Sequence, residues 1–383
     1  MPERRRRLTP TLLSDDSVST HEIVSLDEHV AEEIWSGNER PPAQVVSGDD
    51  PSLREVPAGE RLLTQTEAVI EAIASEMRAD PCVFYIGQDV GAMGGSLQGT
   101  RGLLAEFGPG RIREAPIAES AMVGAAVGAA LFGRRPIVEI SFGEFIPAAM
   151  NQLINQAPNI HYMTGGAGRV PLVVRTRVGD GPYGGHPQDY SAWFAHVPGW
   201  KVVMPSQSGD AYGLMRSAIR DDNPVLFVEP MSLAHAPRGA VDLAAGGVPI
   251  GEARVVRRGA DVTVAAIGSM VPVSLRAAET LAADGVDVEV IDLRSIQPLD
   301  TACVVASVRH TGRLVTVHEA WVTGGLGAEV AAVVAEACPE ALRAPVVRVG
   351  TAAVPTPSGK VRAHALPNAE QIVKAVRHAC GQP

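Results

Sequence analysis

Apolar runs alternate with segments of helical period along most of this chain from residue 65 onward. Short apolar runs without polar alternation are typical of strands buried on both faces of a parallel sheet. Such runs lie at residues 82–86, 137–140, 172–175, 201–204 and 225–229. Segments with helical spacing separate them at residues 66–77, 120–132, 145–156 and 209–220. The pattern therefore predicts an α/β domain with a parallel sheet over residues 61–235.

A second α/β domain is predicted over residues 253–383, after a stretch rich in Ala, Gly and Pro at residues 236–252 that we interpret as a linker. Here the strands are expected at residues 262–267, 286–291, 313–318 and 345–349, and the helices at residues 273–283, 301–308, 327–337 and 369–379. The fold class is therefore α/β with two tandem domains.

The amino-terminal residues 1–60 are polar and contain several prolines, so we expect most of this acidic extension to be disordered. One part differs from the rest, because Ser25–Glu28 fits a capping box and Leu26, Val30 and Ile34 recur at helical spacing. This segment predicts a short helix that either docks on a protein surface or forms only transiently.

Composition and charge narrow the class of protein. Hydrophobic residues make up 46% of the chain and aromatic residues 4%, and 39 glycines suit tightly packed α/β layers. The net charge of −10 is concentrated in residues 1–60, which hold 13 Asp and Glu against six Arg, so nothing indicates nucleic-acid binding. The chain shows no apolar run of membrane-spanning length and no secretory signal. Four widely spaced cysteines favour a reducing compartment, so we expect a cytoplasmic location.

One carboxylate, Glu119, stands at the start of a segment made almost wholly of small and apolar residues, 120–131. A helix without a polar face should be buried on all sides. A carboxylate placed where water is scarce can exchange protons near neutral pH, because desolvation favours the protonated form. The alternative is that Glu119 only complements the helix dipole.

Two further places carry polar groups that suit chemistry. His186 lies in a glycine-rich stretch between a predicted strand and a short helical segment at residues 190–196, so its imidazole is a candidate acid, base or hydrogen-bond donor, or else a loop histidine bonded to backbone. Asp221 and Asn223 follow the helix at residues 209–220, where free carbonyls add oxygens that suit a hard cation or simply end the helix. The glycine clusters at residues 87–95 and 324–327 lack the full spacing of a dinucleotide-binding motif.

Taken together, motifs spread over residues 62–378 resemble the β subunits of thiamine diphosphate-dependent 2-oxo acid dehydrogenases. This family is the decarboxylating first component of the pyruvate and branched-chain complexes, with the related acetoin dehydrogenases. The matching segments are residues 87–90, 107–112, 116–120, 162–166, 193–199, 217–224, 290–295 and 325–329. The resemblance implies a transketolase-like chain, with a pyrimidine-binding domain followed by a transketolase C-terminal-like domain.

The resemblance also implies a role for each matching residue. Glu119 matches the glutamate that hydrogen-bonds the pyrimidine ring of thiamine diphosphate, and Phe145 matches an aromatic residue that stacks against that ring. His186 matches a histidine that acts when the acyl group passes to a lipoyl group. A structural potassium ion is implied at Leu172, Ala218, Ile219, Asp221 and Asn223.

The family also implies partners, because this chain has no diphosphate anchor of its own. Gly179-Asp180-Gly181 is the start of such an anchor, but the next Asn is Asn223, 42 residues later and in the wrong context. In the family an α subunit supplies the Mg²⁺ and diphosphate site, so we expect an α2β2 heterotetramer, together with a lipoyl-bearing acyltransferase and a small 2-oxo acid. Departures from the family pattern at residues 88, 151, 185, 187 and 357–359 leave the acyl substrate and acceptor open, so the alternatives are an acetoin dehydrogenase β subunit or a thiamine diphosphate-dependent carboligase of specialised metabolism. A third interpretation, a non-catalytic assembly subunit, is disfavoured by the presence of Glu119 and Phe145.

Overall fold

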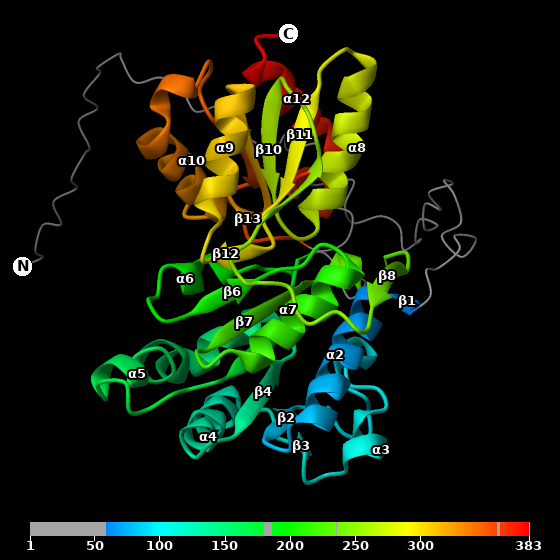
Figure 1. Ribbon diagram of the computed structural model, residues 1–383, viewed down its shortest axis with the longest axis vertical. Coiled ribbons are helices and arrows are strands. Elements are labelled where there is room, and N and C mark those ends of the chain that lie inside the picture. The colour runs from blue at the N-terminus through cyan, green and yellow to red at the C-terminus, as the bar shows by residue number, and fades with distance from the viewer. Residues whose placement is uncertain (1–58, 180–185, 235, 358–360, 383) are drawn as a thin grey trace, which may run out of the picture. The chain divides into compact units, whose positions relative to one another are not determined.

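The computed structural model of this chain describes residues 59–179, 186–234, 236–357 and 361–382. Residues 1–58 of the predicted disordered extension, with the predicted short helix after Ser25, lie outside these ranges, whereas its last residue, Glu60, begins a strand. The described strands form sheets of seven, five and two strands, and helices cover the faces of the two large sheets (Figure 1). Both large sheets belong to one compact unit, so the contacts between them can be described.

The first large sheet has the strand order β12-β6-β7-β5-β4-β2-β3. Its strands β2 to β7 pair in parallel, and β12, contributed by the second half of the chain, pairs antiparallel with β6. Residues of β4, β5 and β7 are buried almost throughout, as expected of central strands covered on both faces. The bounds are β2 (Val83–Gly87), β3 (Ile112–Glu114), β4 (Arg135–Ile140), β5 (Val173–Val178), β6 (Lys201–Val203), β7 (Val225–Pro230) and β12 (Ser295–Gln297).

Helices pack on both faces of this sheet. Apolar residues of α2 (Gln65–Ala79) and α7 (Ser208–Arg220) pack against one face, and those of α4 (Glu119–Leu131) pack against the other. α2 begins with a capping box in which the Thr64 hydroxyl and the Glu67 carboxylate accept each other's backbone N–H groups. The short elements are η2 (Ser96–Gln98), α3 (Leu103–Phe107), α5 (Ile160–Met163), α6 (Ser191–Ala195) and η5 (Met231–Leu233).

The second large sheet has the order β14-β13-β10-β11-β9, parallel except for β9 (Arg254–Arg257) at one edge. Helices α8 (Met270–Ala283) and α12 (Ala369–Ala379) pack on one face, and α9 (Thr301–Thr311) and α10 (Leu326–Ala337) on the other (Figure 1). The remaining elements are β10 (Val262–Ala266), β11 (Val288–Asp292), β13 (Leu314–Trp321), β14 (Val347–Thr351), η6 (Pro339–Ala341) and α11 (Arg362–Ala365).

The prediction of one regular helix over residues 145–156 is wrong. The chain instead forms a 3-10 helix, η3 (Gly143–Ala149), followed by a π-helix, η4 (Asn151–Gln156). Pro147 lies inside η3 and has no backbone N–H to donate, so a regular α-helical ladder cannot run through it.

The predicted linker at residues 236–252 contains a strand. β8 (Gly239–Asp242) pairs antiparallel with β1 (Glu60–Leu63), and the two form the two-stranded sheet. Four-residue strands carry too few positions for an apolar period, so the sequence pattern missed both of them.

The prediction that α4 is buried on every side is also wrong for this chain. Met122, Val123 and Ala126 face the core, but Ala121 and Ala125 are exposed because no described element covers that side of the helix. Leu131 and Phe132, at the carboxyl end of α4, are 46% and 91% exposed. The described part of the chain thus leaves one apolar helix face uncovered.

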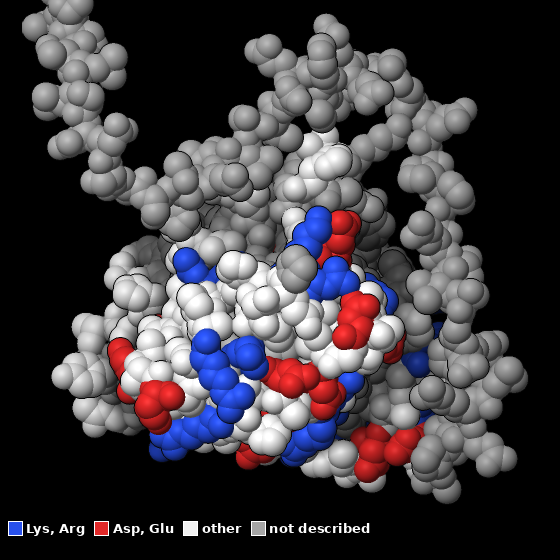
Figure 2. All heavy atoms as spheres, turned by 90° about the horizontal axis from the view of Figure 1, so that it is seen from above, with Lys and Arg blue, Asp and Glu red and all other residues white. Residues whose placement is uncertain are grey.

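The rest of the surface carries both signs of charge. On the face drawn in Figure 2, acidic and basic side chains are interspersed rather than gathered by sign. The four cysteines are free thiols. Within the described ranges, no helix has the length and apolar character needed to cross a membrane.

Candidate functional site

Three of the sequence-predicted residues follow strands that end at the same edge of the seven-stranded sheet. Glu119 follows β3, Phe145 follows β4, and His186 follows β5. These strands and β2 run parallel in the order β5-β4-β2-β3, so their carboxyl ends share one edge. Open α/β sheets bind ligands beyond this edge, and the three residues are therefore placed where such a site forms.

Glu119 is the first residue of α4 and is partly buried. The Ser120 hydroxyl donates to the carbonyl of Ala148, which joins the first turn of α4 to η3, the helix that carries Phe145. Ala118 offers no side-chain cap, and no group in the described part of the chain donates to the Glu119 carboxylate. Its oxygens are therefore available to a bound ligand.

Phe145 and His186 are in direct contact. Their ring centroids lie 4.7 Å apart, and the Phe142 ring lies 5.4 Å from the imidazole and 6.0 Å from Phe145. The side chain of His186 is 45% exposed, so the imidazole borders solvent on one side and aromatic rings on the other. The structure thus brings together two residues that are 41 positions apart in the sequence.

The contact partner of His186 that sequence reasoning missed is Glu144. Its Oε2 lies 2.9 Å from His186 Nδ1, and its Oε1 accepts the backbone N–H of Gln188 at 3.2 Å. The one sequence signal for this residue is a carboxylate directly before Phe145. Residues 180–185, which precede His186, lie outside the described ranges.

A buried charge cluster, made of Tyr85, Glu139, Arg175, Arg177 and Glu229, lies among the strands beneath this edge. Arg175 pairs with both oxygens of Glu229 at 2.6 and 3.0 Å and with Glu139 at 3.4 Å. Burial by itself would raise the pKa of Glu139, but Arg177 and Arg175 hold it below its ordinary value. The cluster crosslinks β2, β4, β5 and β7, and so fixes the strands from which η3 and the His186 segment emerge. Its sequence signal was two arginines inside a buried strand.

The five residues predicted to bind potassium do gather around one turn. The carbonyl of Leu172 accepts the N–H of Val225, two residues beyond Asn223. The guanidinium of Arg135 already donates to the carbonyls of Ile219 and Asp221, at 2.8 and 2.7 Å. The oxygens of this turn are therefore partly occupied by a cation of the protein itself.

The Asp221 carboxylate is occupied in the same way. It accepts the ammonium of Lys201 and the side-chain amide of Asn223, the latter at 2.9 Å. Burial would raise the pKa of Asp221, but Lys201 and the N–H groups of Asn223 hold it below its ordinary value. The donor set is oxygen-rich and partly bonded to Arg135 and Lys201, and potassium binding stays a prediction from the resemblance.

The second domain packs close to the same edge. The Tyr190 ring stacks on Trp193 at 4.3 Å and lies 5.8 Å from Trp321 of β13. Gly179, directly after β5, has φ +80°, and a Cβ there would lie 2.6 Å from the Glu319 carboxylate. The positive φ favours glycine at this position, and a side chain there would also displace the Glu319 carboxylate.

A second group of polar contacts between the two domains, called the seam below, involves residues 206–210 and 292–294. The Ser206 hydroxyl donates to Asp292 at 2.5 Å, and Arg294 pairs with Asp210 at 3.1 Å. Asp292 is fully buried, and burial raises its pKa to about 6. The seam therefore holds a carboxylate that titrates in a mildly acidic range.

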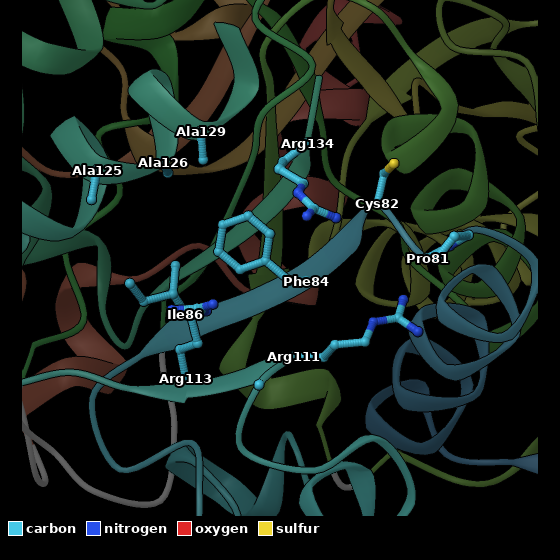
Figure 3. A pocket seen from close by; sticks show the side chains of 11 residues that line it. Pro81, Cys82, Phe84, Ile86, Arg111, Arg113, Ala125, Ala126, Ala129 and Arg134 are labelled. Atoms are coloured by element: carbon cyan, nitrogen blue, oxygen red, sulfur yellow. The ribbon is translucent and has the colours of Figure 1, made fainter. Parts of the chain in front are cut away.

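A pocket that is separate from Glu119, Phe145 and His186 lies beside α4. It has a volume of about 490 Å³ and lies between α4 and the strands β2 and β3 (Figure 3). Phe84, Ile86 and alanines of α4 form its apolar part, and Arg111, Arg113 and Arg134 supply its charge. None of Glu119, Phe145 and His186 lines it, so this pocket is a groove beside the uncovered face of α4 and not part of the edge site.

Two family models match the chain. The model of the transketolase pyrimidine binding domain matches residues 62–236, and that of the transketolase C-terminal domain matches residues 251–372. A solved structure titled "Split gene transketolase, inactive beta4 tetramer" superposes with a TM-score of 0.68 and 25% sequence identity, covering 84% of this chain and 99% of its own. The predicted fold class, two tandem transketolase-like domains, is confirmed.

Curated relatives match over most of the chain. The pyruvate dehydrogenase E1 component subunit beta-2, mitochondrial, of Oryza sativa subsp. japonica is 42% identical over 350 residues, which cover 88% of this chain and 91% of the relative. The E1 component subunit beta of Rhizobium meliloti (strain 1021) is 41% identical over 342 residues, 87% of this chain and 73% of the relative. That of Leifsonia xyli subsp. xyli is 40% identical over 333 residues, 85% of this chain and 97% of the relative.

Proposed function

Because this chain belongs to the family of β subunits of the pyruvate dehydrogenase E1 component, we propose that it supplies half of a thiamine diphosphate site for the oxidative decarboxylation of pyruvate. The acyl group then passes to the lipoyl group of an acyltransferase partner. The relatives reported above do not favour the alternatives of an acetoin dehydrogenase or a carboligase. A non-catalytic assembly subunit would have no use for Glu119, Phe145 and His186 at one edge.

The observation that carries this proposal is the gathering of these three residues at the carboxyl edge of the pyrimidine-binding domain. Thiamine diphosphate, when bound, supplies the electron sink for loss of carbon dioxide. No described group donates to the Glu119 carboxylate, which can share a proton with a ring nitrogen of the pyrimidine. Phe145 is partly buried and offers an aromatic face for a planar ring. These residues fit the pyrimidine half of the cofactor.

His186 suits the acyl-transfer side of the reaction. Its imidazole borders solvent, so a lipoyl group arriving from outside can reach it. With Nδ1 directed at Glu144, the other ring nitrogen is free to exchange a proton with the sulfur of the acyl acceptor.

An α subunit is the partner that would complete the site in an α2β2 heterotetramer. This chain lacks a motif for binding Mg²⁺ and diphosphate, and the α subunit would supply those contacts. The uncovered face of α4, with exposed Ala121 and Ala125, begins next to Glu119. The groove beside it combines apolar side chains with three arginines (Figure 3). A subunit that covers this face would also exclude water from Glu119. A cytoplasmic location stays a prediction, since named relatives include bacterial and mitochondrial proteins.

Substitution of Glu119 in the assembled enzyme tests this proposal. In the α2β2 enzyme, Glu119→Gln should reduce decarboxylation, measured with an artificial electron acceptor, by about 100-fold or more, the size of a lost acid–base group. Glu370→Gln is the matched control, because Glu370 also stands in the first turn of a helix, α12, but far along the chain from the site.

The control separates the catalytic role from the helix-dipole alternative, since both variants lose the same charge at a helix start. Full activity in Glu119→Gln would refute the role of Glu119. A similar fall in Tm in both variants, with decarboxylation unchanged, would support the dipole alternative instead.

A further inference from the structure

The contact between Glu144 and His186 joins two segments at the candidate site. Glu144 lies in η3 directly before Phe145, and its Oε2 is 2.9 Å from His186 Nδ1. The Glu144 side chain is 19% exposed and that of His186 is 45% exposed, so the pair lies at the mouth of the site rather than in the core. The loss of an exposed ion pair alone would change stability little.

Glu144 uses both of its oxygens on the same segment. While Oε2 faces the imidazole, Oε1 accepts the backbone N–H of Gln188 at 3.2 Å. A carboxylate can accept at both oxygens, whereas an amide of the same size has only one acceptor. Glu144 therefore constrains the ring of His186 and the backbone two residues later.

This constraint matters because the backbone of His186 is in a disfavoured conformation. Its φ is +65°, in the left-handed region, and Pro187 follows it, which disfavours helical conformations further. The rings of Phe142 and Phe145 lie against the imidazole, at 5.4 and 4.7 Å. Among the described residues, the charged group that contacts the imidazole is Glu144.

The identity of the ring nitrogen that carries the proton follows from this contact. A carboxylate accepts but does not donate, so Nδ1 carries the hydrogen of this contact, and Nε2 is the nitrogen that carries none whenever the imidazole is neutral. We propose that Glu144 is a positioning residue, whose carboxylate fixes the tautomer and orientation of His186 so that Nε2 serves the acyl acceptor. This inference rests on the proposed function, since it assigns Glu144 a role only through His186.

A double-mutant cycle in the assembled α2β2 enzyme tests this role. The variants are Glu144→Gln, Glu144→Asp, His186→Ala and the Glu144→Gln/His186→Ala double variant. Three quantities are measured: the single-turnover rate of acyl transfer to a free lipoyl domain, the decarboxylation rate with an artificial electron acceptor, and the affinity for thiamine diphosphate.

Glu144→Gln should slow acyl transfer by between about 10- and 100-fold, the range seen when a group that orients a functional side chain is lost. Decarboxylation and thiamine diphosphate affinity should stay within about twofold, because Glu144 acts through His186 and not on the cofactor. Glu144→Asp keeps both acceptor oxygens and should recover part of the rate. In the His186→Ala background, Glu144→Gln should cause no further loss.

Each failure points to a different error. If His186→Ala itself leaves acyl transfer unchanged, the role of His186 in the proposed function is wrong. If His186→Ala slows acyl transfer but Glu144→Gln does not, the positioning role of Glu144 alone is wrong. A full additional loss in the double variant, or equal loss of decarboxylation and acyl transfer in Glu144→Gln, would mean that Glu144 acts independently of His186 and would overturn the inference.

Discussion

Replacing Asp292 by Asn should stabilise the protein above neutral pH. Asp292 is fully buried at the end of β11, where its Oδ2 accepts the Ser206 hydroxyl at 2.5 Å and its Oδ1 accepts the N–H of Arg294 at 3.1 Å. Burial is the main cause that raises its pKa to about 6, and the nearby charge of Asp210 adds to the effect. Asn has nearly the same shape, keeps an acceptor for the Arg294 N–H, and carries no charge.

The magnitude follows from the two states of the carboxyl group. Its pKa is about 6 in the folded chain against an ordinary 3.8, so the folded state binds the proton more tightly than the unfolded state. At about 1.4 kcal/mol for each tenfold difference in proton affinity, the ionised group costs the folded protein about 3 kcal/mol. Below about pH 4 the carboxyl group is protonated in both states, and the folded protein keeps its full stability. This stability is lost as the pH rises through about 6, where the buried carboxyl group ionises. Asp292→Asn removes this loss.

Thermal unfolding of the assembled enzyme at pH 5 and pH 8 measures the effect. At pH 8 the Tm of Asp292→Asn should exceed that of the unchanged protein by about 5 °C, and at pH 5 the difference should shrink. Asp242→Asn is the control, since Asp242 is exposed and its substitution makes the same change in net charge. A lower Tm in Asp292→Asn at pH 8, or a difference that does not depend on pH, would refute the reasoning. Either result would mean that the nearby Arg254 compensates the buried charge.

The remaining predictions concern the oxygen-rich turn and the buried charge cluster. Exchange of K⁺ for choline at constant ionic strength should leave the Tm of the assembled enzyme unchanged, because Arg135 and Lys201 already hold the oxygens of the turn. Arg135→Met should make the Tm depend on K⁺. If the Tm of the unchanged enzyme and that of Arg135→Met depended on K⁺ equally, Arg135 would not be the group that occupies these oxygens. Glu139→Gln should lower the free energy of unfolding by about 3 kcal/mol or more, because it leaves Arg175 and Arg177 buried with one carboxylate between them. Urea unfolding measures this loss, and a loss below about 1 kcal/mol would show that the cluster is easily rearranged.

Long apolar runs predicted the central strands well, because a strand buried on both faces has little room for polar side chains. The runs at residues 137–140 and 225–229 lie within β4 and β7. The η3 and η4 helices were mispredicted because apolar spacing does not report where Pro147 interrupts the hydrogen-bond ladder. The short strand β12 was missed because its partner, β6, lies in the other domain, about 90 positions earlier in the sequence. Local patterns carry no information on such pairings.

The residues of the candidate site also fall into those that the sequence predicted and those that only the structure revealed. Glu119, Phe145 and His186 could be named from motifs, since each stands in a recognisable local sequence. Glu144 could not, because its importance comes from a contact with a histidine 42 positions away. The charged residues of β5 contradict the apolar pattern of a buried strand, and only the fold shows that Glu139 and Glu229 neutralise them. Contacts between distant segments decide which polar residues work together.

The uncovered face of α4 explains why the sequence rule for buried helices failed in this chain. Leu131 and Ile160 both lie within 3.4 Å of the position a Cβ at Gly168 would take, so the end of α4 and α5 are neighbours. Phe132, Tyr162 and Met163 near this junction are 91%, 90% and 75% exposed. Monomeric proteins rarely expose apolar side chains so extensively, and such patches mark contacts with other proteins. The apolar pattern of α4 is therefore the one expected of a helix within an assembly, and one partner subunit would account both for the open helix face and for a Glu119 carboxylate without a donor among the described residues.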